Sequence, residues 1–145
     1  MKNRKVAIIG GLEFFVAMAL LVLCWEKGNA QECRIVRINE VPIGYKTKLE
    51  LDPPTISIAP NNCIVWFNRG MTIKARISFQ DGKKCQAMTK GPSGFALDTP
   101  RNCYVTEYIP LGGTSSLTFN EKGTYNYEVE TVEGLKEKGA IIVKE

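Results

Sequence analysis

The sequence predicts an all-β fold, a sandwich or barrel of short strands, and three observations lead to this prediction. Apolar and polar residues alternate with a period of two through most segments between residues 49 and 143, which is the spacing of a strand with one buried face. Turn residues separate these segments at short intervals. No window in this range has the apolar stripe of an amphipathic helix. Short strands at such spacing are typical of sandwiches and barrels.

Seven segments carry this strand pattern. They are residues 49–52, 56–58, 63–67, 75–79, 117–119, 125–129 and 140–143. The run 63–67 is almost continuously apolar, as expected for a central strand buried on both faces. Between the segments stand the turn sequences Pro53-Pro54, Pro60-Asn61-Asn62, Asp81-Gly82, Gly112-Gly113 and Lys122-Gly123. The stretch from Cys85 to Cys103 fits no strand, because it is rich in Gly and Pro, and we expect a long loop there.

The first thirty residues have the layout of an export signal. Residues 1–5 are basic, residues 14–25 are apolar, and Gly28 and Ala30 are small residues at the positions that a signal peptidase reads. We therefore expect a signal peptide over 1–30 and a periplasmic or secreted protein. Two alternatives remain open: residues 6–25 as an uncleaved membrane anchor despite Glu13, and lipidation at Cys24.

Four cysteines remain after the predicted leader, and an even number in an oxidising compartment predicts two disulfides. Cys85 and Cys103 flank the long loop, so they are the first-choice pair, and Cys33 then pairs with Cys63. Closing a loop of that size stabilises a protein by roughly 3 kcal/mol in the chain-entropy model. The alternative that some of the four are buried free thiols stays open.

The chain divides into the leader 1–30, a lead-in 31–48 and one domain 49–145, a size that suits a single domain. The net charge is +4, and residues 1–30 contribute +2 of it, so the remainder also carries +2. A body so near neutrality excludes a strong electrostatic interaction with nucleic acid. We expect an unknown protein partner in the cell envelope, and membrane contact only through an uncleaved or lipidated N-terminus.

Two segments resemble the cupredoxins, the blue copper proteins. Residues 55–68 end in Trp66-Phe67-Asn68 and are similar to a signature strand of that family. Residues 117–127, which end in Tyr125-Asn126-Tyr127, and the later Gly139–Val143 segment are similar to its C-terminal end. The resemblance covers about residues 49–145 and implies a Greek-key β-sandwich of seven or eight strands.

The resemblance also implies a type 1 copper site, formed by two His, one Cys and a weak axial Met. The chain contains no histidine. Lys74 or its neighbour stands at the first His position, Val129 at the Cys position, residues 131–133 at the second His position and Leu135 at the Met position. The sequence therefore predicts a cupredoxin-like domain without type 1 copper. Met71, Cys85 and Met88 form an alternative Cu(I) site, because Cu(I) favours sulfur ligands.

The sequence predicts no enzyme, since no histidine is present to serve as a base and no serine lies in a nucleophile motif. We expect a structural or interaction module, with the copper-binding or electron-transfer protein as the alternative. Recognition normally uses loops on a rigid sandwich, so the expected interaction loops are 69–74 and 131–138. Their candidate residues are Arg69, Met71, Lys74, Glu133 and Leu135. Phe95, in the long loop, is either an exposed anchor or a core residue.

Overall fold

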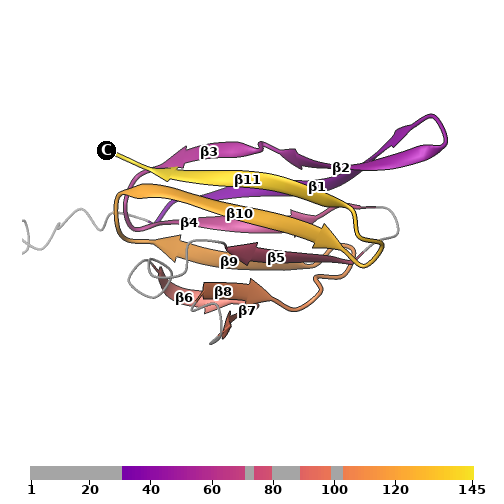
Figure 1. Ribbon diagram of the computed structural model, residues 1–145. Coiled ribbons are helices and arrows are strands. Elements are labelled where there is room, and N and C mark those ends of the chain that lie inside the picture. The colour runs from indigo at the N-terminus through magenta and orange to yellow at the C-terminus, as the bar shows by residue number, and fades with distance from the viewer. Residues whose placement is uncertain (1–30, 71–73, 80–88, 99–102) are drawn as a thin grey trace, which may run out of the picture. The chain divides into compact units, whose positions relative to one another are not determined.

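Two β-sheets packed face to face make up the described part of the chain (Figure 1). The computed structural model describes residues 31–70, 74–79, 89–98 and 103–145. Its strands are β1 (Cys33–Ile43), β2 (Lys46–Asp52), β3 (Thr55–Ile58), β4 (Asn62–Asn68), β5 (Ala75–Phe79), β6 (Thr89–Ser93), β7 (Phe95–Asp98), β8 (Cys103–Thr106), β9 (Thr114–Phe119), β10 (Gly123–Thr131) and β11 (Lys136–Val143).

The strand order is β2-β1-β4-β9-β6 in one sheet and β3-β11-β10-β5-β8-β7 in the other. Neighbouring strands are antiparallel except for two parallel pairs, β1 with β4 and β3 with β11. The chain passes from the first sheet to the second at Pro53-Pro54, between β2 and β3. Because β1 and β4 are parallel, both strands end at the same end of the sandwich.

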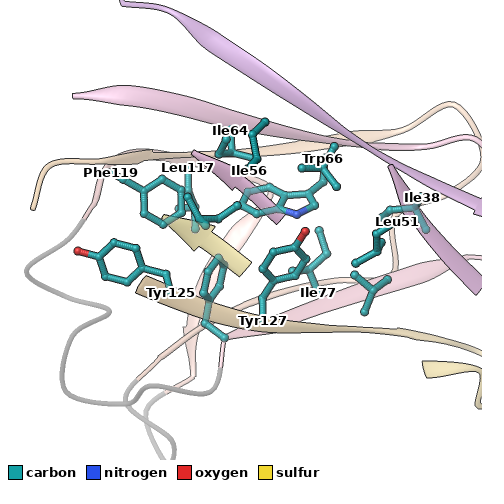
Figure 2. Close-up of a cluster of buried hydrophobic side chains, with 14 of the residues drawn as sticks. Ile38, Leu51, Ile56, Ile64, Trp66, Ile77, Leu117, Phe119, Tyr125 and Tyr127 are labelled. Carbon is teal, nitrogen blue, oxygen red and sulfur yellow. The ribbon is translucent and has the colours of Figure 1, made fainter. Parts of the chain in front are cut away.

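An aromatic cluster joins the two sheets (Figure 2). The Trp66 ring of β4 packs edge-on against the rings of Phe79 and Tyr127 in the opposite sheet, with centroid distances of 5.8 and 5.4 Å. Tyr127 also covers Gly139 on the neighbouring strand, and a Cβ at position 139 would overlap its ring. These inward-facing side chains come from the alternating segments of the sequence, so the predicted period of two is confirmed.

Phe95 belongs to this core. Its ring lies 5.4 Å from that of Trp66 and 6.0 Å from that of Phe79, and the side chain is half-buried against the cluster. The structure therefore supports the prediction that Phe95 is a core residue and not the prediction that it is an exposed anchor.

The prediction of an all-β sandwich is confirmed, but the described residues form eleven strands, not seven or eight. Four strands match none of the seven predicted segments: β1 lies in the predicted lead-in 31–48, β6 and β7 lie in the predicted loop 85–103, and β8 begins at the last residue of that loop. Strand β1 is hard to predict because it contains Pro42, and proline normally argues against the interior of a strand. The expected burial of 63–67 on both faces holds only in part, because the outward-facing Val65 and Phe67 are half-buried.

The predicted disulfide between Cys33 and Cys63 is present and joins the parallel strands β1 and β4. Cys103 is also disulfide-bonded, and its predicted partner Cys85 lies outside the described residues. So does the predicted signal peptide, 1–30. In the described part of the chain, no helix is long and apolar enough to cross a membrane.

Candidate functional site

One end of the sandwich gathers the two loops that the sequence singled out. We call it the loop end: there β1 and β4 finish, β5 and β9 begin, β10 finishes and β11 begins. The strand registers fix this arrangement, because Ile38 pairs with Asn68, Thr114 pairs with Phe67, and Ala75 pairs with Thr131. The β1–β2 hairpin continues past the last residue of β4 and projects from the same end (Figure 1).

The buried side chain of Asn68 organises the centre of the loop end. Its Nδ2 donates to the carbonyl of Ile109 (2.9 Å), and its Oδ1 accepts from the backbone N–H of Gly70 (2.9 Å). Its backbone carbonyl accepts from Gly112 (2.9 Å) and its N–H donates to Gly113 (3.0 Å). Asn68 therefore ties the loop that begins at Arg69 to the 107–113 loop.

The 131–135 turn closes on itself around Thr131. The N–H of Thr131 donates to the carbonyl of Leu135 (2.9 Å), and the Thr131 hydroxyl accepts from the Leu135 N–H (3.1 Å). The next residue, Val132, donates its N–H to the carbonyl of Lys74 (3.3 Å). The structure thus brings the two predicted interaction loops into direct contact.

The predicted interaction residues occupy different depths at this end. Arg69, Lys74 and Glu133 are exposed, whereas Leu135 is half-buried and packs against the core. Met71 lies outside the described residues. Leu135 therefore supports the turn from beneath.

The side chains at the positions that the resemblance assigns to the copper ligands have no imidazole or sulfur atoms. Val129 is completely buried in the core. Thr131 is also buried, and its hydroxyl is used within its own turn. Leu135 ends in methyl groups. Of the alternative Cu(I) residues, Met71, Cys85 and Met88, none lies in the described ranges. Those ranges hold no group of three or more His, Cys, Asp or Glu side chains placed to bind a metal ion.

Exposed apolar side chains gather at the loop end, and the sequence did not predict them. The described residues contain seven large hydrophobic side chains that are exposed, and five belong to the loops and the hairpin of this end. These five are Ile43, Tyr45, Tyr108, Leu111 and Val132. The remaining two, Ile35 and Leu97, lie within β1 and β7. Alternation cannot reveal such residues, because they lie in turns or at strand ends.

A small charge network lies beside this apolar surface, on the outer face of the second sheet. Arg76 pairs with Glu130 (3.2 Å) and lies over the Tyr108 ring, 5.3 Å from its centroid. Lys136 pairs with Glu128 (3.0 Å). The hydrogen bond from Arg76, assisted by the charge of Lys136, holds the pKa of Glu130 below its usual value. These exposed pairs contribute little to stability, but the arginine fixes the position of Tyr108.

Comparison with protein-family models finds no match, and no curated protein matches the chain. Solved structures of amicyanin resemble the fold. A methionine-to-glutamine variant in the Cu(I) state is 18% identical, covers 77% of this chain and 82% of its own, and gives a TM-score of 0.48. Amicyanin from Paracoccus versutus is 18% identical over 76% of this chain and 81% of its own, with a TM-score of 0.44.

The fold itself is visible in the sheet order and in the core. Two sheets enclose Trp66 and the inward-facing Tyr125 and Tyr127, as the resemblance implied. The chain has a cupredoxin-like fold.

Proposed function

We propose that this chain is an exported interaction module that binds a protein partner of the cell envelope through its loop end, without catalysis and without type 1 copper. The observation that carries the proposal is the position of the exposed apolar side chains: five of the seven in the described residues lie at this one end. A concentration of exposed large apolar side chains on one part of a domain is typical of an interaction site. Asn68 holds its loop by a buried hydrogen bond and Thr131 holds its turn by a partly buried one, so the surface is presented on a rigid base.

The side chains at the positions that correspond to the copper ligands support a domain that works without type 1 copper. The chain has no histidine, and the positions that correspond to the Cys and Met ligands hold Val129 and Leu135. To test this part, the oxidised protein is mixed with Cu(I) and Cu(II) separately, and bound metal and visible absorption are measured. We expect no stoichiometric binding. Tight copper that is lost in Met71→Ala or Met88→Ala would establish the alternative sulfur site instead.

The partner-binding part is tested in the cells that make the protein. A photo-reactive amino acid replaces Leu111 at the loop end or, as the matched control, the exposed Lys122 at the opposite end. We expect a defined cross-linked product from position 111 and none from position 122. The cross-linked protein is then purified, and its affinity for the wild-type chain and for Leu111→Ala is measured. Equal affinities, or cross-linking of the same protein from both positions, would refute binding through the loop end.

A further inference from the structure

A groove of about 290 Å³ opens between the β1–β2 hairpin and the start of β11. Most of the surface inside the groove belongs to apolar atoms. The lining residues are Ile43, Lys46, Thr47, Lys48, Leu49, Leu135, Lys136 and Glu137. The groove adjoins the loop end, because Leu135 and Ile43 belong to both. Strand β2 forms one wall and is the terminal strand of its sheet.

The backbone of β2 turns unpaired groups toward this free edge. The carbonyl of Ile38 accepts from the N–H of Arg69, which lies on the β4 side of β1. The Ile38 backbone therefore points away from β2, and its cross-strand partner Leu51 points away from β1. By alternation, the N–H and C=O groups of Thr47 and Leu49 also point outward. In the described part of the chain, no hydrogen bond is found for them.

The opposite wall of the groove is less able to accept a strand. Strand β3 pairs with β11 only from Ala140 to Val143, so the first half of β11 also has a free edge. On that edge, however, the N–H of Lys138 already donates to the carboxylate of Glu137 (3.2 Å). This edge of β11 therefore has fewer free backbone donors than the edge of β2.

The charges of β2 determine which kind of strand can pair with its free edge. Lys46 and Lys48 are exposed, and the structure gives neither an ion pair within the described residues. Lysines along an edge oppose pairing with the same edge of a second copy, because like charges would lie opposite each other. The same lysines favour a strand that presents carboxylates to them.

We propose that β2 binds an extended, acidic peptide segment of a partner protein by strand addition. The segment pairs with the outward N–H and C=O groups of Thr47 and Leu49, places an apolar side chain in the groove, and sets carboxylates beside Lys46 and Lys48. In strand addition, backbone hydrogen bonds supply affinity and side-chain pockets supply specificity. This inference rests on the proposed function, since it names the partner chemistry at the side of the loop end.

The fragment 31–145 contains all eleven strands and the described core, so it is used for the test. A short peptide of alternating glutamate and valine is titrated into it and followed by amide NMR and hydrogen exchange. We expect saturable binding with new protection of the Thr47 and Leu49 amides. The matching lysine–valine peptide should bind at least roughly tenfold more weakly, a difference of about 1.4 kcal/mol.

Two variants separate the backbone contribution from the charges. Thr47→Pro removes an outward N–H and leaves the β1–β2 ladder intact, as Pro42 does on the facing strand, so we expect binding to be lost at an unchanged melting temperature. Lys46→Glu combined with Lys48→Glu should reverse the peptide preference, and it remains informative if the proline variant does not fold. Lys144→Glu, at an exposed lysine that follows β11 at the opposite end of the sandwich, is the matched control and should bind as the wild type does.

The proposal is overturned if the acidic peptide does not bind, or if it binds these β2 variants as tightly as the wild type. A dimer of the fragment that Thr47→Pro dissociates would also overturn it, since the occupant would then be a second copy. A partner that depends on Leu111 but is unaffected by Thr47→Pro would refute strand addition and leave the proposed function standing.

Discussion

The two ends of the sandwich use similar hydrogen bonds to hold their loops but expose different kinds of side chain. At the loop end, the turns present Tyr108, Leu111 and Val132 to solvent. At the opposite end, the described turn before β10 is polar and charged, and its Lys122 pairs with Glu145. Both ends rest on a buried side chain that bonds to a loop carbonyl: Asn68 donates to Ile109 at the first, and Tyr125 donates to Glu121 at the second.

This comparison distinguishes the features that stabilise the fold from those that the fold does not require. At each end, one side chain satisfies a loop carbonyl; the bond from Asn68 is buried and the bond from Tyr125 is partly buried. A backbone group left unpaired is costly where it is buried. Among the described residues, the turn that joins β9 to β10 carries no exposed large apolar side chain, so such side chains are not required of every turn in this fold. The apolar surface of the loop end therefore requires an explanation other than stability, and partner binding supplies one.

The largest effect is expected from Asn68→Ala. Its side chain satisfies the Ile109 carbonyl and the Gly70 N–H. The buried Gly70 N–H would be left unpaired, at a cost of about 1–3 kcal/mol, whereas the Ile109 carbonyl would keep the Ala75 N–H as a donor and lose only its second hydrogen bond, worth about 1 kcal/mol. We therefore expect a loss of about 3 kcal/mol in the free energy of unfolding. Urea denaturation measures it, and hydrogen exchange should show that residues 107–113 lose protection first. A loss below about 1 kcal/mol would mean that water replaces the amide and that the loop end is less rigid than proposed.

Alkaline pH tests the core that lies between the two ends. Burial raises the pKa of Tyr127 to about 12, whereas an unfolded tyrosine ionises near pH 10. The contribution to stability is therefore complete below pH 10 and is lost as the pH rises from 10 to 12. Two pKa units correspond to about 3 kcal/mol.

Tyr127→Phe is the matched variant for this pH dependence. The Tyr127 hydroxyl lies beside the Trp66 side chain but makes no hydrogen bond of ordinary geometry within the described residues, so its removal should leave stability at pH 7 nearly unchanged. Between pH 10 and 12, the variant should lose less stability than the wild type in denaturation curves. Parallel pH profiles of the two proteins would contradict the assignment of this loss to Tyr127.

Much of the core was predictable from the sequence, and the outcome depended on side-chain alternation. Tyr125, Tyr127 and Val129 are spaced by two, so their common burial follows from strand geometry. The same pattern could not reveal β1 throughout, because Pro42 reads as a strand breaker. The structure shows why it is tolerated: its position faces away from β2, so no hydrogen bond of that ladder is lost.

The candidate site was less predictable than the fold. The resemblance indicated the loops that contain Lys74 and Glu133, and the structure joins these loops through Val132. The contribution of the hairpin and of Leu111 depends on which strands end together, which is a property of the sheet order. Sequence spacing does not contain that information. The groove beside β2 was missed for the same reason, since its walls belong to different sheets.

A smaller effect is expected from Tyr125→Phe at the opposite end. The hydroxyl donates to the carbonyl of Glu121 (2.6 Å), and the loss of one such hydrogen bond costs about 1 kcal/mol. Thermal and urea unfolding both measure it. Because this end is not proposed to bind a partner, cross-linking from position 111 should be unchanged. Loss of that cross-linking would show that the two ends are coupled.

The smallest effect on stability is expected from Leu111→Ser, and it tests the comparison most directly. Leu111 is 59% exposed, so the fold gains little from its side chain, and the change in unfolding free energy should stay within about 0.5 kcal/mol. Binding to the cross-linked partner should nevertheless weaken, because the buried leucine surface would be lost from the complex. If Leu111→Ser lowered the free energy of unfolding as much as the binding free energy, Leu111 would contribute mainly to the stability of the fold. The two ends would then differ in composition and not in function.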